Sequence, residues 1–178
     1  MNTAKTLELL RSEAAGTRMC ELYGADKAEE NIRRYEDLVQ KFQENFGEKD
    51  ILMFSSPGRT EISGNHTDHN HGKVLAGSIN LDCVGIAAKN ESSKVNIISE
   101  TFHQKFTIDL NDLQPSAKKA GTVDLVKGLL KGFQESGYEV GGFDAYITSN
   151  VISSAGVSSS ASLSLIHISE PTRLGMIS

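Results

Sequence analysis

The chain has 178 residues, with 18 lysines and arginines against 23 aspartates and glutamates, and therefore a formal net charge of −5. With 38% apolar and 23% charged residues, it has the composition of a globular protein long enough for one domain with a core. No stretch approaches the roughly 18 apolar residues of a membrane span, and the mildly acidic balance argues against nucleic-acid binding. The N-terminus lacks the apolar block of a secretory signal. We therefore expect a cytoplasmic protein in which Cys20 and Cys83, which form no CxxC pair, are reduced thiols.

Residues 3–47 are predicted to be helical. Apolar residues recur at roughly helical spacing in two runs, separated by a break at Gly24 and Asp26. Charged residues recur every four positions in the second run, which predicts a solvent-exposed face formed by Glu29, Arg33, Asp37 and Lys41. We expect residues 1–48 to form a helical N-terminal extension.

From Ile51 onward the sequence predicts mainly strands. Short apolar or alternating runs have the length and composition of strands at 51–56, 74–79, 83–89, 94–99, 105–110 and 142–149. Residues 90–93 are predicted to form a hairpin turn, so that the strands pair antiparallel in part. An amphipathic helix is predicted over 122–136, begun by Thr122 and ended by Gly137. This order of elements predicts an α+β fold, with residues 49–162 as a partial domain.

The densest polar segment, residues 56–72, directly follows a predicted strand, where sites on rigid scaffolds usually lie. The Pro-Gly dipeptide before Arg59 permits a sharp turn, and Arg59 then presents a permanent positive charge with five N–H donors. Asn65, His66 and Asp68 offer the mixed donors and acceptors that the vicinal hydroxyls of a sugar require. The segment therefore indicates a sugar-binding site.

Two other interpretations of this segment stay open. His66, His69, His71 and Asp68 carry groups that ligate transition metals, although no HExxH register or CxxC partner accompanies them. The other interpretation is a polar turn whose histidines bond only to local backbone groups.

A second candidate site is the small-residue segment SSAGVSSSAS at 153–162, between a predicted strand and a predicted helix start. Small residues let the backbone approach a polyphosphate, and successive N–H groups at a helix start bind anions. The hydroxyls of Ser158, Ser159 and Ser160 add donors, and one of them can join the ligand shell of Mg²⁺. The segment is not a Walker A motif, because it lacks the GK[ST] ending, and a serine-rich segment alone is also typical of a linker.

Together the two segments resemble the galactokinase family. GRTEISGNHTDHNHG is similar to the galactokinase signature GRxNxIGEHTDYNxG. AGVSSSAS is similar to the phosphate loop of the wider family of galactokinases, homoserine kinases, mevalonate kinases and phosphomevalonate kinases. The resemblance implies the N-terminal domain of these kinases, a mixed sheet with helices on one side. It also implies transfer of the γ-phosphoryl group of Mg·ATP to the anomeric hydroxyl of galactose. Nothing in the sequence indicates a protein partner.

The resemblance implies a role for each matching residue. Arg59 would lie near the transferred phosphate and the anomeric hydroxyl. The sugar would be bound by Asn65, His66, Thr67 and Asp68. The ATP loop would consist of Ser154, Ala155, Gly156, Val157, Ser158, Ser159 and Ser160, with Ser160 also a ligand of Mg²⁺. In the family, the catalytic aspartate and the acidic Mg²⁺ ligand follow this loop, so we expect the 178-residue chain itself to be inactive.

The segment departs from the signature at Asn65, where the family has Glu, at Glu61, where it has Asn, and at His69, where it has Tyr. Asn65 can still hydrogen-bond a hydroxyl, but it supplies no carboxylate. Two alternatives therefore stay open. One is a kinase for N-acetylgalactosamine or arabinose, and the other is a galactose- and ATP-binding sensor that regulates transcription without turnover.

Residues 163–178 do not fit the rest of the chain. The segment LSLIHISEPTR, from Leu163 to Arg173, is what one frame of a sequencing-library transposase adapter encodes. We hypothesise that residues 163–178 are translated adapter, and that the chain is a fragment; the alternative is a genuine tail with an unusual Glu-Pro break. Genomic reads that continue through SLIHISEPTR would refute the hypothesis.

Overall fold

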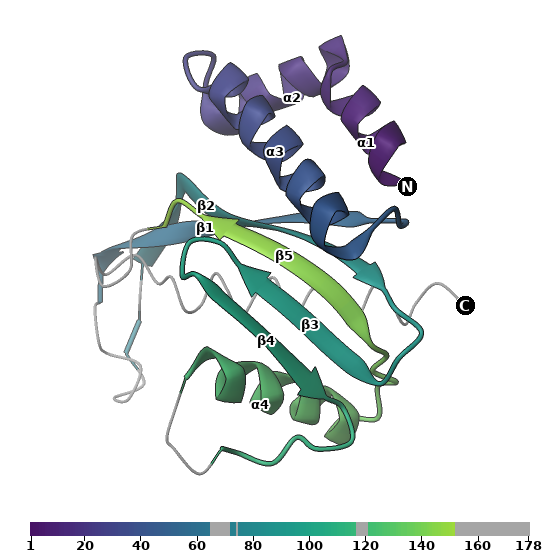
Figure 1. Ribbon diagram of the computed structural model, residues 1–178. Helices are drawn as coiled ribbons and strands as arrows, with labels where there is room; N and C mark the ends of the chain where they lie inside the picture. The colour runs from purple at the N-terminus through teal and green to yellow at the C-terminus, as the bar shows by residue number, and fades with distance from the viewer. Residues whose placement is uncertain (65–71, 74, 117–120, 152–178) are drawn as a thin grey trace.

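The computed structural model describes residues 1–64, 72–73, 75–116 and 121–151 (Figure 1). Three helices come first, namely α1 (Thr3–Leu10), α2 (Glu13–Tyr23) and α3 (Ala28–Phe46). They are followed by β1 (Leu52–Ser63), β2 (Leu75–Lys89), β3 (Lys94–Ser99), β4 (Gln104–Asp109), α4 (Thr122–Glu135) and β5 (Phe143–Ser149). The predicted α+β class is confirmed.

The N-terminal stretch is helical as predicted, but it forms three helices rather than two. The additional break follows α1, where the Ser12 side chain accepts a hydrogen bond from the Ala15 N–H at 3.2 Å and so begins α2. Helix α3 ends at Phe46 and is followed by the C-cap Gly47, whose φ of +80° suits glycine. The predicted charged face of α3 is largely exposed, although Lys41 also forms an ion pair with Glu100 beyond β3.

The five strands form one mixed sheet in the order β1-β2-β5-β3-β4. Neighbouring strands are antiparallel except for β3 and β5, which are parallel. The predicted antiparallel pairing is thus confirmed in part, but the predicted hairpin at 90–93 is wrong. Strand β5 lies between β2 and β3, so the turn that joins them passes over the beginning of β5.

Two strands are longer than the sequence predicts. The runs at 74–79 and 83–89 belong to the single strand β2, and β1 continues from the apolar run at 51–56 through the first part of the polar segment. Polar residues can extend both strands because pairing of their backbones needs no apolar face. The predicted helix at 122–136 is confirmed as α4, although its N-cap is Gly121 rather than Thr122.

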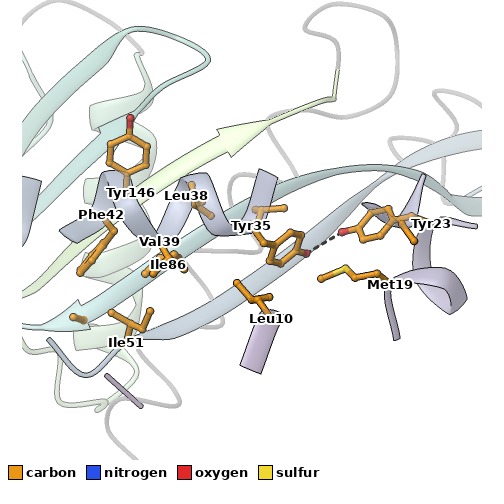
Figure 2. Packing of buried hydrophobic residues seen from close by; sticks show 13 residues of the cluster. Leu10, Met19, Tyr23, Tyr35, Leu38, Val39, Phe42, Ile51, Ile86 and Tyr146 are labelled. Carbon is orange, nitrogen blue, oxygen red and sulfur yellow. Dashed lines mark hydrogen bonds between the residues drawn. The ribbon is translucent and has the colours of Figure 1, made fainter. Parts of the chain in front are cut away.

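Helices cover both faces of the sheet. Helices α1–α3 pack against one face through Val84, Ile86 and Ala88 of β2, and Figure 2 shows part of this cluster. Helix α4 packs against the opposite face, where Cys83 and Ala87 point. The expectation of helices on one side therefore holds for α1–α3 and is wrong for α4. Because both faces are covered, residues 82–88 of β2 are buried without alternation.

Candidate functional site

Arg59 lies on a two-stranded ribbon that β1 and β2 form beyond the rest of the sheet (Figure 1). Strand β5 pairs with β2 only over residues 83–89, whereas β1 and β2 stay paired as far as Ser63 and Leu75. The Cα partner of Arg59 is Ser78, and Arg59 itself is exposed. Residues of β2 in this ribbon are exposed or half-buried, so Arg59 is held in position by backbone pairing rather than by core packing.

The other predicted sugar-binding residues, Asn65, His66, Thr67 and Asp68, lie outside the described residues. Their neighbours in the chain are described. Ser63 pairs with Leu75, and Gly64 between Ser63 and Asn65 has a φ of +86°. The ribbon thus brings the two residues that flank 64–74 to paired positions.

The predicted ATP loop, Ser154 to Ser160, and the proposed adapter tail also lie outside the described residues. Strand β5, which precedes the loop, ends at Ser149, and the Asn150 N–H donates to the carbonyl oxygen of Asp82 at 2.9 Å. Asp82 is in turn the Cα partner of Pro57. The structure therefore brings the approach to the serine-rich segment next to the base of the Arg59 ribbon.

The register of β1 and β2 shifts at this base. Pro57 is opposite Asp82, but Arg59 is opposite Ser78, so residues 79–81 of β2 face the single residue Gly58. Proline is tolerated here because β1 is an edge strand of the sheet. The shift is a bulge that sets the direction of the ribbon leaving the sheet.

Asp82 is the most heavily bonded residue of this base, and it is only 3% exposed. Its carboxylate accepts hydrogen bonds from Arg34 Nη1 at 2.6 Å, from Tyr23 Oη at 2.5 Å and from Ser55 Oγ at 2.5 Å. Arg34 Nη2 also donates to the Asp82 carbonyl oxygen at 3.1 Å. A buried carboxylate is tolerated when it is paired and bonded in this way.

Two tyrosines extend this network into the helical layer. Tyr23 Oη lies 2.9 Å from Tyr35 Oη, as the dashed line in Figure 2 shows. Burial, followed by the hydrogen bond to Asp82, raises the pKa of Tyr23 far above its usual value. Tyr23 therefore stays protonated, and its hydroxyl serves as a donor to the carboxylate.

On the face of the sheet opposite α1–α3, three short side chains occupy one row across β1, β2 and β5. Ser56 is the Cα partner of Cys83, which is the partner of Ser149. Burial raises the pKa of the Cys83 thiol to about 12, so this thiol is not a nucleophile at neutral pH. Both cysteines are free, as predicted. Ser56 Oγ is buried and has no hydrogen-bond partner in the described part of the structure.

The described residues contain no group of three or more histidine, cysteine, aspartate or glutamate side chains that could hold a metal ion. The histidine cluster at His66, His69 and His71 lies outside them. In the same described part of the chain, no helix combines the length and apolarity that crossing a membrane requires.

Arg34 and Asp82 are not among the site residues that the sequence predicts. A signal was present in both cases, because Asp82 interrupts an apolar strand and Arg34 directly precedes Tyr35 on the apolar side of α3. Neither signal identifies the partner, since the two residues are 48 positions apart in the sequence.

Comparison with known proteins gives matches that cover the same elements. A family model described as the galactokinase galactose-binding signature matches residues 40–89, which include β1 and β2. A curated galactokinase of Clostridium tetani is 36% identical over 136 residues, which cover 76% of this chain and 34% of that protein. One of Lactococcus lactis is 38% identical over 141 residues, which cover 77% and 35%.

Solved structures of such kinases also match this chain. The crystal structure of Lactococcus lactis galactokinase complexed with galactose matches with a TM-score of 0.68 and 37% identity, over 75% of this chain and 35% of that one. The Methanococcus jannaschii mevalonate kinase matches with a TM-score of 0.60 and 16% identity, over 70% and 40%, which concerns the fold alone. The mixed sheet is thus the fold of the small-molecule kinases that include galactokinase and mevalonate kinase. Within this class, the curated relatives that match are galactokinases, 36–38% identical to this chain over about three quarters of its length. The chain spans about a third of the length of the curated relatives it matches.

Proposed function

We propose that the chain supplies the sugar-binding and phosphate-binding part of a galactokinase, an enzyme that transfers the γ-phosphoryl group of ATP to the anomeric hydroxyl of galactose. The observation that carries the proposal is the pairing of Pro57 with Asp82 and the bond from Asn150 to Asp82. These contacts place the base of the signature ribbon beside the approach to the serine-rich segment. A sugar and a polyphosphate bound by the two segments would then be neighbours, as phosphoryl transfer requires.

In this proposal Arg59 stabilises the charge that develops on the transferred phosphoryl group. Asn65, His66, Thr67 and Asp68 bind galactose, and residues Ser154 to Ser160 bind ATP. The donor set fits these ligands, because small residues and hydroxyls suit phosphate oxygens and the Ser160 hydroxyl suits Mg²⁺. Mg²⁺ would neutralise phosphate charge when bound.

Galactose is favoured over N-acetylgalactosamine or arabinose because the curated relatives named above are galactokinases.

We place the protein in the cytoplasm, where the free thiols of Cys20 and Cys83 stay reduced. The 178-residue chain is proposed to be inactive alone, because the family's catalytic aspartate and acidic Mg²⁺ ligand follow the loop.

The test begins with the native gene, read past the codon for Ser162. The protein it encodes and the 178-residue chain are then assayed side by side for ADP release and galactose 1-phosphate formation. We expect turnover by the encoded protein and none by the chain. Turnover by the chain would refute its proposed inactivity, whereas galactose binding without turnover by the encoded protein would favour the sensor.

A further inference from the structure

Asp82 connects the two halves of the proposed site to the helical layer. Its carboxylate receives hydrogen bonds from α2, α3 and β1, and its carbonyl oxygen receives them from Arg34 and from Asn150 beyond β5. We propose that Asp82, held by Arg34 and Tyr23, is a positioning residue that sets the Arg59 ribbon relative to the approach to the serine-rich segment. This proposal rests on the proposed function and deepens it.

The location of Asp82 explains why its hydrogen bonds affect the ribbon. Asp82 is the β2 residue that borders the bulge on the side of the sheet, and the next pair along the ribbon is Arg59 with Ser78. Beyond the bulge the residues of β2 are exposed or half-buried, so core packing no longer fixes the strand. The direction in which the ribbon leaves the sheet therefore depends on how firmly its base is held.

The helices hold that base. Arg34 of α3 and Tyr23 of α2 contribute three of the hydrogen bonds to Asp82, and Arg34 is itself only 14% exposed. Charge-assisted bonds of this kind are stronger and more directional than neutral ones. The N-terminal helices thus act on the site through Asp82.

Asp144 provides a matched control. It is 4% exposed against 3% for Asp82, pairs with Lys49, and accepts hydrogen bonds from Asn90 at 2.9 Å and Asn96 at 2.7 Å. It lies at the other end of the β2–β5 pair, opposite Ala88. Losing either carboxylate disturbs a buried ion pair, but only Asp82 lies at the ribbon.

The experiment measures amide hydrogen exchange of the 178-residue chain carrying Asp82→Asn or Asp144→Asn, with global stability followed by urea unfolding. In Asp82→Asn we expect exchange at residues 59–63 and 75–78 to accelerate on the order of tenfold relative to β3 and β4. In Asp144→Asn we expect those amides to change less than twofold relative to β3 and β4. Equal ribbon effects in both variants, or none in either, would overturn the proposal.

A milder pair keeps the test valid if Asp82→Asn does not fold. Tyr23→Phe removes one donor to Asp82, whereas Tyr146→Phe alters a tyrosine of the same cluster that does not donate to Asp82 in the described part of the structure. Only Tyr23→Phe should accelerate ribbon exchange, by a few-fold. Acceleration by both, or by neither, contradicts the proposed role.

Galactose titration of the same variants separates this proposal from the proposed function. We expect Asp82→Asn to weaken binding several-fold and Asp144→Asn to leave it within twofold. If the unaltered chain binds no galactose, the proposed function fails for this chain, while the exchange data still decide the role of Asp82. Unchanged galactose affinity in Asp82→Asn, with binding by the unaltered chain, would overturn the positioning role.

Discussion

Gly142 lies so close to Ser92 that a Cβ atom on Gly142 would be 2.0 Å from the Ser92 carbonyl oxygen. The carbonyl oxygen of Gly142 also accepts a hydrogen bond from the Asn90 N–H at 3.0 Å. At this point the turn that joins β2 to β3 passes over the beginning of β5. The insertion of β5 between those two strands therefore requires a residue without a side chain at position 142.

Replacing Gly142 by alanine should destabilise the fold by about 3 kcal/mol or more, because the new methyl group would overlap backbone oxygens that cannot rotate away. Gly141→Ala is the control, since a Cβ there has nothing within 4 Å, and we expect a change within about 0.5 kcal/mol. Urea unfolding of both variants measures the difference. Equal stabilities would show that the turn shifts without cost.

Arg59→Ala, made in the galactokinase that we propose the native gene encodes, should lower kcat on the order of 10²-fold and change galactose affinity less. The reason is that a charge facing the transferred phosphoryl group matters most in the transition state. Steady-state kinetics and galactose titration measure the two effects. Arg33→Ala serves as the control, because Arg33 is exposed on α3 and pairs with Glu29. A weaker galactose affinity with unchanged kcat would make Arg59 a binding residue only.

Asn65→Glu should strengthen galactose binding relative to arabinose if position 65 contacts the primary hydroxyl that arabinose lacks. A charged hydrogen bond is worth roughly 1.5–3 kcal/mol against about 1 kcal/mol for a neutral one, so the gain approaches tenfold. The measurement is the ratio of kcat/KM for the two sugars in the encoded protein.

Glu61 enters the design because a second carboxylate near position 65 would repel the new one. The double variant Asn65→Glu with Glu61→Asn restores the commoner pattern and separates the two effects. If neither variant alters the galactose-to-arabinose ratio, Asn65 does not contact the sugar.

The stability of the fold should fall in acid partly through Asp144. Burial alone would raise the pKa of Asp144, but hydrogen bonds from Asn96, Lys49 and Asn90 outweigh it and hold the pKa below the ordinary value of 3.8. A lowered folded-state pKa means that the stabilisation is present above about pH 5 and is lost as the pH falls through the folded pKa.

We therefore expect Asp144→Asn to be less stable than the unaltered chain at pH 7, and to lose less further stability between about pH 5 and pH 2. Urea unfolding at a series of pH values gives both curves. Parallel curves over this range would contradict the lowered pKa of Asp144.

The α+β class, the boundaries of β3, the helical N-terminus and the similarity to galactokinases could all be predicted from the amino-acid sequence. Each of these depends on local properties, such as the spacing of apolar residues, turn residues, and the order of side chains in the signature. Such properties are readable along the chain because they concern residues close to one another in it.

Three features could not be predicted from the sequence: β5 separates β2 from β3, α4 covers the face opposite α1–α3, and Arg34 and Tyr23 meet at Asp82. The residues at 90–93 have the composition of a hairpin turn whether the next strand pairs directly or is displaced by one position. Likewise, a buried carboxylate needs a cationic partner, but its identity depends on which helix the sheet brings to it. The side-chain contacts of Asp82 with Tyr23 and Arg34 join residues up to 59 positions apart, and the packing of α2 and α3 on the sheet decides them.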